Sequence, residues 1–385
     1  MRTVYGLKQA ANRFYRLLVS VMTTLSFDKS KADPCLYHKW DEEQGLMVWL
    51  SWCDDLLLFG RNKDSVLTGV KKLKKHFVVD DVGALEDYLG CKIDFNWSKP
   101  SCKFTQPVLV QAMHDQHGAT NKKPTYLPAT ANTTLHRVDE EDSDSVSPAE
   151  QKRYRGIVGQ LLHMAAWSRP DICNAVREVS RHGHKSKKEH MTAAKKIATF
   201  IWHTPSRGWT LSPTRRWNGK DRSFQFKVRG RPDSNYANCT DTRKSVTGFI
   251  VYLEDAPVAI RSVMQKIIAL SVTEAELIAL VQCLQEIFCQ ESAGIMGLKV
   301  ELPMLIECDN KGAVDLVNGH SVGGNTKHIA VRILHVRDYK DKGVIRVKWI
   351  PTETNEADIS TKNSSRVVYE KHAPKYIGSL GRRES

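Results

Sequence analysis

The sequence lacks an apolar run of the roughly 20 residues that a membrane-spanning helix needs, and its N-terminus lacks a signal-peptide pattern. Its nine cysteines form no paired C-x-x-C cluster, so we predict reduced thiols rather than a zinc site or a disulfide framework. Acidic residues are also few, 43 against 57 basic ones, which gives a net charge of +14. Such an excess favours a polyanionic partner, most commonly nucleic acid. We therefore predict a cytoplasmic or nuclear protein that binds nucleic acid and no membrane.

The segment WLSWCDDLLLFG, residues 49–60, places two adjacent acids, Asp54 and Asp55, inside an otherwise apolar run. Two charges about 4 Å apart repel by roughly 4 kcal/mol at an effective dielectric constant near 20, before any cost of desolvation. One interpretation is a hairpin whose acidic tip lies in water between two strands. The other is a divalent-metal site, because a bound cation lets carboxylates share a dry place. The local pattern leaves both interpretations open.

Composition divides the chain into five segments. Residues 1–120 mix strands with helices, including a helix predicted at 65–77, and indicate an α+β domain. Residues 121–149 are rich in Pro, Thr and Ser and indicate an exposed linker. Residues 150–222 predict three helices, broken near Pro170 and ended near Pro205. Residues 223–365 indicate an α/β domain and residues 366–385 a basic tail, so the predicted fold class is multidomain, α/β and α+β.

Strands and helices alternate regularly in residues 223–365. Strands are predicted at 224–228, 245–253, 266–271, 303–308 and 344–350, and helices at 274–288, 311–317, 327–340 and from 358. A mixed sheet with helices after its third, fourth and fifth strands is an α/β sandwich. This element order is similar to that of RNase H-like folds.

Four acids fall where this order brings strand ends and helix starts together: Asp233, Glu276, Asp309 and Asp358. Asp309 and Asp358 have a simpler explanation as helix caps, since Asp is a preferred capping residue. Glu274 lies three residues after Ser271, the capping-box spacing, and we assign it that structural role. Glu276 has no such role and is expected to face the sheet edge.

Carboxylates that converge on one point need cations between them. Two divalent metals about 3.5–4 Å apart can activate a water and stabilise the leaving oxygen in an in-line phosphodiester displacement. We therefore predict that Asp233, Glu276, Asp309 and Asp358 bind two Mg²⁺ ions, with Mn²⁺ as an alternative, and hydrolyse a nucleic-acid backbone.

Further motifs run along nearly the whole chain. They are VYGLKQAANRFYRLL (4–18), SWCDDLLLFG (51–60), LEDYLGCKIDF (85–95), YRGIVGQLLHMAAWSRPDICNAVREVSR (154–181), ALSVTEAELIAL (269–280), ECDNKGAV (307–314), TKHIAVRILHVRD (326–338) and VKWIPTETNEADISTK (347–362). The series resembles the C-terminal part of a Ty1/copia-type retrotransposon Pol polyprotein, in which reverse transcriptase is followed by RNase H.

The resemblance implies a role for each block. Residues 1–120 would be part of a reverse-transcriptase palm and thumb, 150–222 a connection region, and 223–365 an RNase H-like domain that cuts the RNA strand of RNA–DNA hybrids. Asp54 and Asp55 would hold Mg²⁺ in the palm. Contacts with template-primer or hybrid are implied for Gly6, Lys8, Gln9, Arg243, Lys244, Lys327 and His328.

Several positions depart from the family pattern. The chain begins at the template-contacting motif, after the palm strand that carries the third catalytic Asp, so we expect little or no polymerase activity from it alone. Trp52 replaces a Tyr, Asn235 and Ala330 stand where Asp is usual, and Asn363 replaces a Pro. Together these departures indicate a sequence under relaxed evolutionary constraint. Two alternatives stay open. One is an inert nucleic-acid-binding remnant, and the other is a subunit that a separate N-terminal half complements.

Overall fold

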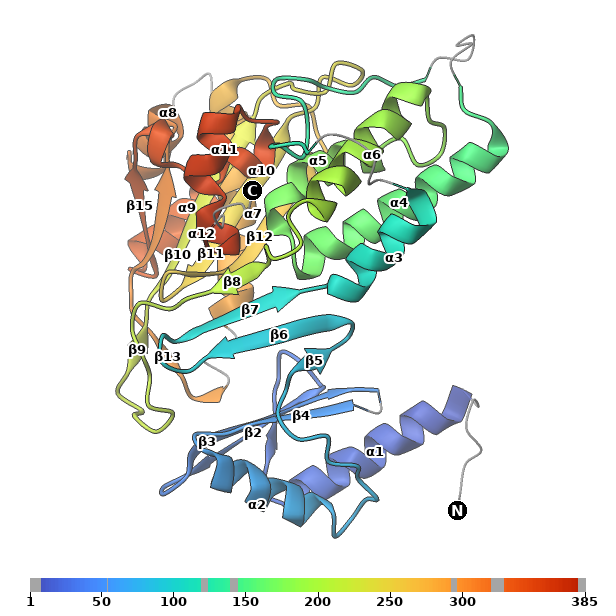
Figure 1. The fold of residues 1–385 in the computed structure, drawn as a ribbon. Coiled ribbons are helices and arrows are strands. Elements are labelled where there is room, and N and C mark those ends of the chain that lie inside the picture. The colour runs from blue at the N-terminus through green and yellow to red at the C-terminus, as the bar shows by residue number, and fades with distance from the viewer. Residues whose placement is uncertain are drawn as a thin grey trace. The chain divides into compact units, whose positions relative to one another are not determined.

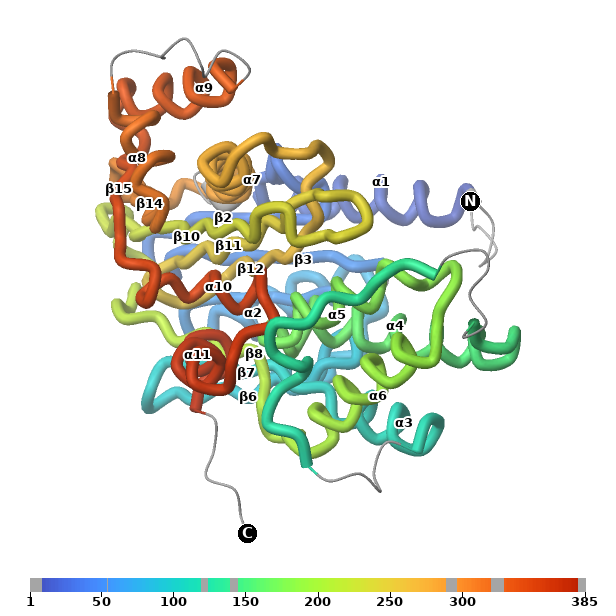
Figure 2. Tube along the Cα trace, turned by 90° about the horizontal axis from the view of Figure 1, so that it is seen from above, coloured from blue at the N-terminus to red at the C-terminus, as the bar shows by residue number. Residues whose placement is uncertain are grey.

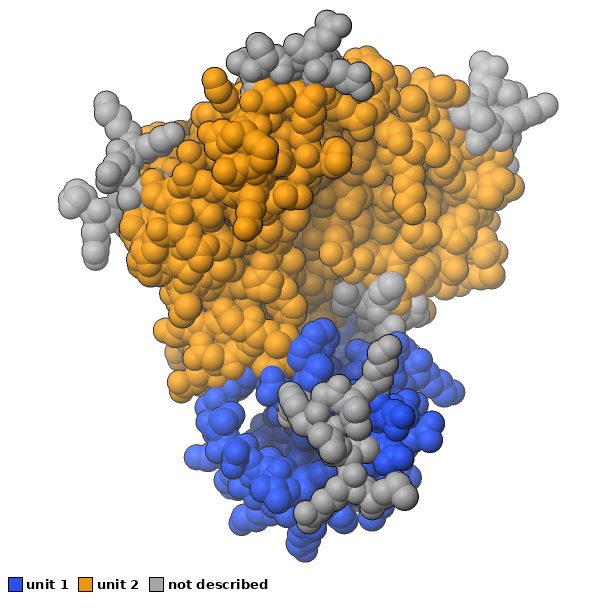
Figure 3. Space-filling model, turned by 90° about the vertical axis from the view of Figure 1, so that its right-hand side faces the viewer, with its two compact units in different colours: residues 1–85, 215–226, 289–300 blue, residues 86–214, 227–288, 301–385 orange. Residues whose placement is uncertain are grey.

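The computed structural model describes residues 8–53, 55–118, 124–138, 145–291, 296–319 and 329–379. Gly6, Asp54, Lys327 and His328 lie outside the described residues, as does the side chain of Lys8, so the roles given to them stay predictions. The chain divides into two units (Figure 3), unit 1 with residues 1–85, 215–226 and 289–300, and unit 2 with residues 86–214, 227–288 and 301–385. Within the described ranges, no helix has the length and apolar character needed to cross a membrane.

Unit 1 is an antiparallel sheet with two helices (Figure 1). The sheet has the order β1-β2-β3-β4, from β1 (Asp28–Lys29), β2 (Leu36–Asp41), β3 (Gly45–Trp52) and β4 (Asp55–Phe59). Side chains from α1 (Lys8–Thr24), α2 (Lys63–Leu73) and the strands share a core that includes Leu18, Met22, Trp49 and Leu73. The predicted helix at 65–77 is α2, which begins after Asn62 because the Asn62 side chain accepts a hydrogen bond from the Ser65 N–H. Later in the chain, β9 (Gln225–Phe226) pairs in parallel with β13 (Lys299–Val300).

Unit 2 opens with a four-stranded antiparallel sheet and a group of helices. The sheet has the order β5-β6-β7-β8, from β5 (Asp87–Tyr88), β6 (Cys91–Asn96), β7 (Ser101–Thr105) and β8 (Trp209–Leu211). The helices are α3 (Pro107–His117), α4 (Pro148–Trp167), α5 (Cys173–Ser180) and α6 (Lys188–Trp202). The last three confirm the helices predicted for residues 150–222, with a 3₁₀ turn at Pro170–Ile172 where the break was expected.

The second sheet of unit 2 is mixed and has five strands in the order β12-β11-β10-β14-β15. These are β10 (Val228–Asn235), β11 (Val246–Leu253), β12 (Ala256–Met264), β14 (Met304–Cys308) and β15 (Ile345–Trp349). The pairs β12/β11 and β11/β10 are antiparallel, whereas β10/β14 and β14/β15 are parallel. The helices around it are α7 (Val272–Glu291), α8 (Lys311–Asn318), α9 (Ala330–Asp341), α10 (Asp358–Thr361), α11 (Arg366–His372) and α12 (Pro374–Ile377). The predicted mixed-sheet α/β fold class is confirmed.

The predicted third strand at 266–271 is wrong, because the third strand is β12 and residues 266–271 form no strand. A two-residue turn, Glu254 and Asp255, joins β11 directly to β12. Both residues have positive φ, +51° and +64°, as in the primed turns that hairpins favour. Because neither Gly nor Asn occupies these two positions, the Glu-Asp pair carries no turn signal in the sequence.

Segments predicted as linker and tail contribute to the core of unit 2. Leu127, Ala129 and Leu135 pack against the large hydrophobic core of this unit, and Tyr369 and Tyr376 of α11 and α12 are buried in it. Residues 124–138 are therefore docked rather than fully exposed, and residues 366–377 are helical. The division into five segments stays a prediction.

A buried ion pair joins the α4–α5 turn to α11. Arg169 donates from Nε and Nη2 to the two carboxylate oxygens of Asp171, each at 2.9 Å, and the Tyr369 hydroxyl donates to Asp171 Oδ2 at 2.6 Å. All three side chains are buried. Burial acts to raise the pKa of Asp171, but the charge and hydrogen bonds of Arg169 outweigh it and hold that pKa below its ordinary 3.8.

Replacing Asp171 with Asn is expected to destabilise unit 2 by about 3–5 kcal/mol, because the Arg169 charge stays buried without its partner. Urea unfolding of the full chain measures this loss. A carboxyl whose pKa is lowered on folding stabilises the protein above its ordinary pKa, and that contribution is lost as the pH falls through the lowered value. The difference between Asp171→Asn and the parent chain should therefore narrow only below pH 3.8.

Glu370→Gln is the control for this prediction, since it removes the exposed Arg366–Glu370 pair and should change stability little. Equal, small effects of the two substitutions would contradict the structural role of Asp171.

Candidate active site

The five-stranded sheet and its helices bring the four predicted acids close to one edge of the sheet. Asp233 lies near the end of β10, Asp309 directly follows β14, Glu276 comes from α7 and Asp358 opens α10. Because β10 and β14 are parallel neighbours, their carboxyl ends meet at the same edge. Helices α7 and α10 lie on opposite sides of the sheet (Figure 2), so Glu276 and Asp358 approach this edge from opposite faces.

Two glycines let these helices approach the sheet closely. A Cβ on Gly230 of β10 would lie 2.5 Å from Cys283 Sγ of α7. A Cβ on Gly248 of β11 would lie 2.1 Å from Ser360 Oγ and 3.2 Å from the Ser360 carbonyl carbon, in α10. Gly248 pairs with Asp233 across the β10–β11 ladder. The contact between β11 and α10 is therefore beside Asp233.

Asp233 is 2 % exposed and lies in a negatively charged environment. Burial raises the pKa of Asp233 to about 7, and the charges of Asp358 and Asp309 act in the same direction, against the Lys362 ammonium. The Thr361 hydroxyl donates a hydrogen bond to Asp233 Oδ2. Asp233 is thus oriented by α10, and its ionised form is disfavoured unless a cation compensates its charge.

Glu276 is 5 % exposed and is attached to β10 by one of its two oxygens. Oε1 accepts hydrogen bonds from the Ser234 N–H at 3.2 Å and the Ser234 hydroxyl at 2.9 Å. Oε2 is buried without a hydrogen-bond partner. Burial and the charges of Asp233 and Asp309 raise the pKa of Glu276 well above its ordinary value. A buried carboxylate oxygen without a donor fits a metal ligand, because such an atom is otherwise costly.

Asp309 and Asp358 do not cap helices through their side chains. The cap of α8 is Asn310, whose Oδ1 accepts from the Ala313 N–H at 2.9 Å. Helix α10 has no side-chain cap, and Asp358 instead accepts a hydrogen bond from Lys362, four residues later. Burial raises the pKa of Asp309. The capping explanation is therefore wrong for Asp309 and Asp358. The structure does agree with the capping role assigned to Glu274, because the Ser271 hydroxyl accepts a hydrogen bond from the Glu274 N–H.

Sequence reasoning missed the cation of this group, Lys362. Burial acts to lower the pKa of Lys362, but the charges of Asp233, Asp358 and Asp309 raise it above its ordinary value. Its spacing of four residues from Asp358 on a helical turn was the signal that could have identified it. Among the described residues, this one ammonium faces four carboxyls, so the site would carry an excess of negative charge with all four ionised.

A close donor set lies within the site. One donor atom each of Glu276, Cys308 and Asp309 lies within 4.8 Å of the others. Among the described residues, this is the group of three or more potential metal-ligating side chains that meets that distance. The oxygens fit the hard-cation preference of Mg²⁺, and Asp233 and Asp358 supply further carboxylates beside it.

The acidic hairpin of unit 1 is built differently. Strands β3 and β4 pair as predicted around the acidic pair, with Trp52 opposite Asp55. Asp55 is exposed, and so are Trp52 and Cys53, the latter with a φ of +52°. Asp55 is therefore in contact with water, as the hairpin interpretation expects, and Asp54 lies outside the described residues.

The described residues predicted to bind nucleic acid are at the surface. Gln9 is exposed on α1. Arg243 is exposed and Lys244 half-buried in the loop between β10 and β11. This loop follows β10, the strand that carries Asp233. Gln9 lies in unit 1.

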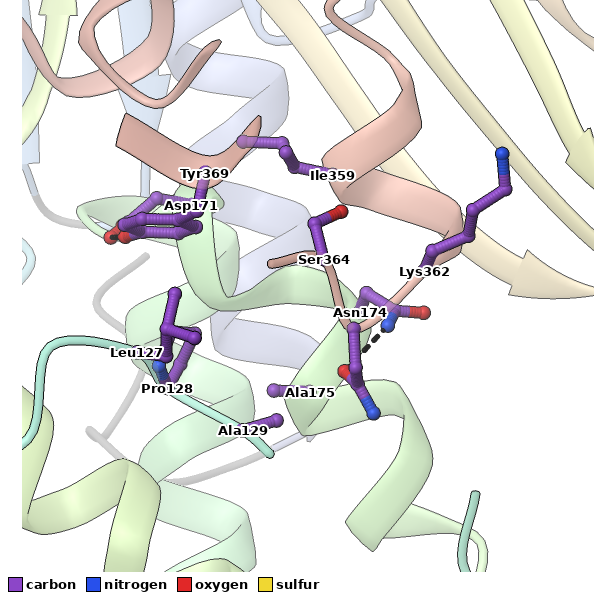
Figure 4. A pocket seen from close by; sticks show the side chains of 11 residues that line it. Leu127, Pro128, Ala129, Asp171, Asn174, Ala175, Ile359, Lys362, Ser364 and Tyr369 are labelled. Carbon is purple, nitrogen blue, oxygen red and sulfur yellow. Dashed lines mark hydrogen bonds between the residues drawn. The ribbon is translucent and has the colours of Figure 1, made fainter. Parts of the chain in front are cut away.

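A pocket beside α10 is distinct from the carboxylate group. It has about 270 Å³ of empty space, open to solvent, and its lining includes Asp171, Asn174, Asn363 and Tyr369. Figure 4 shows Lys362 at its border, with the amine directed away from Asp171 and Tyr369. The Asn174 amide donates to Asn363 Oδ1 at 2.9 Å, and Asp171 is already paired. The pocket therefore lies between α5, α10 and α11, and the acid in its lining, Asp171, is bound to Arg169.

Comparisons with known proteins identify similar sequences and solved structures. A family model described as reverse transcriptase (RNA-dependent DNA polymerase) matches residues 1–131. The chain is 30% identical over 380 residues to the retrovirus-related Pol polyprotein from transposon TNT 1-94 of Nicotiana tabacum, covering 96% of this chain and 27% of that protein. It is 28% identical over 376 residues to the Pol polyprotein from transposon RE1 of Arabidopsis thaliana, covering 97% and 24%.

The chain is thus similar to retrovirus-related Pol polyproteins over nearly its whole length, and the resemblance to the Ty1/copia type expected from the motifs is confirmed. The chain spans about a quarter of the length of these curated relatives. Among solved structures, LC11-RNase H1, isolated from compost, has a TM-score of 0.28 and 18% identity, covering 35% of this chain and 91% of that one. The foamy viral protease-reverse transcriptase in complex with dsDNA has a TM-score of 0.47 and 12% identity, covering 91% and 60%.

Substitution of Gly248 by Ala is expected to displace α10, since the added Cβ meets the Ser360 backbone. We expect a loss of about 1–3 kcal/mol in unfolding free energy, typical of overpacking, together with weaker Mg²⁺ binding in calorimetric titration. Gly159→Ala is the matched control, because Gly159 is exposed in α4 with no atom within 4 Å of the new Cβ and Ala favours a helix. Unchanged stability and Mg²⁺ affinity in Gly248→Ala would contradict the proposed seating of α10.

Proposed function

We propose that unit 2 carries an RNase H-type endoribonuclease site that cuts the RNA strand of RNA–DNA hybrids. Asp233, Glu276, Asp309 and Asp358 would bind two Mg²⁺ ions, or Mn²⁺ in their place. The observation that carries the proposal is the convergence of buried carboxyls at one sheet edge, with an unpartnered oxygen on Glu276. The similarity of nearly the whole chain to Pol polyproteins supports the choice of nucleic acid as substrate.

The side chains of this site hold the acids in place. Ser234 fixes one oxygen of Glu276, and Thr361 orients Asp233. Bound divalent cations supply stabilisation of charge on the attacking and leaving oxygens of a phosphodiester. In the proposed hydrolysis the water oxygen bonds to phosphorus, the bond from phosphorus to the leaving oxygen breaks, and a proton passes to that oxygen. Lys362 keeps one ammonium beside Asp358, where it limits repulsion among the acids.

Basic residues supply the affinity for hybrid in this proposal. The net charge of +14 supports binding through phosphate contacts, which weakens steeply with salt. Arg243 and Lys244 are proposed contacts because they lie at least partly exposed in the loop that follows the Asp233 strand. Lys327 and His328 are proposed contacts of the same kind, and Gly6, Lys8 and Gln9 are proposed contacts to template-primer.

For the reverse-transcriptase part, we propose that Asp54 and Asp55 are palm metal ligands and that the chain alone does not polymerise. Asp55 is exposed, and the close ligand group found among the described residues does not include it. Strand β4 pairs with β3 alone in the described sheet, which supports a protein partner that adds a strand there. Such a strand would bring a further carboxylate to the hairpin.

The test is cleavage of an RNA–DNA hybrid, labelled on the RNA, by the full chain with Mg²⁺ or with EDTA. We expect Mg²⁺-dependent cutting of the RNA strand and a loss of at least about 100-fold in Asp309→Asn, the scale of a lost electrostatic contact in catalysis. Asp315→Asn is the charge-matched control, because Asp315 is exposed on α8. Primer extension on the same sample should give no product.

Two outcomes would redirect the proposal. Salt-dependent hybrid binding without cleavage by a folded sample would favour the inert nucleic-acid-binding remnant and sink the enzyme hypothesis. Cleavage that Asp309→Asn retains would show that the activity comes from another site or from a contaminant.

A further inference from the structure

Cys308 places a sulfur among the acids of unit 2. It is the last residue of β14, it is fully buried, and Asp309 follows it directly. Its Sγ, a carboxylate oxygen of Glu276 and one of Asp309 lie within 4.8 Å of one another. The mechanism proposed above uses the two acids and leaves the thiol without a role.

The group also contains donor capacity that the protein does not use. Glu276 Oε2 is buried and has no hydrogen-bond partner. The hydrogen bond recorded for the Cys308 thiol is a long one, 3.9 Å from Sγ to the Asn310 carbonyl oxygen. Asp309 is half-buried and forms the solvent side of the group. A cation that accepts both oxygen and sulfur would satisfy all three side chains.

The donor types select the cation. Mg²⁺ takes oxygen ligands and gains nothing from a thiolate, whereas Zn²⁺ is bound by Cys sulfur at about 2.3 Å and by Asp or Glu oxygen at about 2.0–2.2 Å. Tetrahedral ligands at those bond lengths lie roughly 3.5 Å apart. Donor atoms within 4.8 Å of one another therefore need to close by little more than an ångström, and a water can occupy the fourth position.

We propose that Glu276, Cys308 and Asp309 form a Zn²⁺ site that overlaps the Mg²⁺ ligand set, so that bound Zn²⁺ inhibits the chain. On binding, a bond forms between sulfur and Zn²⁺ and the thiol proton passes to solvent, with no change of oxidation state. The inhibition rests on the proposed function, whereas the binding does not. Because the two ions share two carboxylates, Zn²⁺ and Mg²⁺ exclude each other.

Binding is tested on the metal-free full chain by calorimetric titration with Zn²⁺ and by the thiolate-to-metal absorption that appears on addition of Cd²⁺. Cys308→Ala should lose one binding equivalent, or at least about tenfold in its affinity, a loss typical even of outer-shell partners. Cys283→Ala is the matched control, because Cys283 is also fully buried in unit 2 but does not belong to the group. Cys308→Ser keeps the side-chain volume and replaces Cys308→Ala if the latter fails to fold.

Inhibition is tested by adding Zn²⁺ to the Mg²⁺-dependent hybrid cleavage, with each variant normalised to its own uninhibited rate. Half-inhibition should need at least about tenfold more Zn²⁺ in Cys308→Ala than in Cys283→Ala. Equal Zn²⁺ and Cd²⁺ binding by the two variants would overturn the inference, whether or not the chain cuts hybrid. Loss of the Cd²⁺ absorption in Cys308→Ala alone, in a chain without nuclease activity, would support the metal site and count against the proposed function.

Discussion

The repulsion among four gathered carboxyls is the constraint on which the rest of unit 2 depends. Asp233 and Glu276 are buried beside Asp309 and Asp358, and burial together with mutual charge raises the pKa of Asp233 and of Glu276. Such an arrangement opposes folding unless packing elsewhere enforces it. The parallel β10/β14 pair fixes two strand ends side by side, and Gly248 lets α10 approach. The sheet thus holds the acids together, in an arrangement that the proposed cations would stabilise.

The helical segment before the sheet supports this arrangement from outside. Asp171, which follows α4, binds Tyr369 of α11, and Asn174 of α5 binds Asn363, next to Lys362. The Asn363 amide also donates to the Thr133 carbonyl at 2.9 Å. Asn363 departs from the family pattern, yet it ties three segments together behind α10. This departure therefore has a structural role and does not by itself indicate relaxed constraint.

The sequence located a candidate site residue correctly where one local pattern was enough to assign its position in the fold. Asp309 could be placed because it ends an apolar run, and Glu276 because the capping spacing belongs to Glu274. The position of β12 could not be found, since the turn at Glu254 and Asp255 uses residues that carry no turn signal. Lys362 and Ser234 were missed for different reasons. Ser234 binds Glu276 across 42 residues, a contact that only the folded chain shows, whereas the four-residue spacing between Asp358 and Lys362 was a local signal that could have identified that pair.

The two acidic sites of the chain differ in what surrounds them, and that difference bears on their chemistry. Asp55 is exposed at a hairpin, where water solvates its charge and a cation gains little by replacing that water. The acids of unit 2 are largely buried, one of their oxygens has no donor, and among the described residues Lys362 offsets their charge. A cation entering there replaces missing solvation rather than existing solvation. Pre-organised, partly desolvated carboxyls are what charge stabilisation in catalysis requires, which supports the proposed nuclease site in unit 2 more than a metal site at the exposed hairpin.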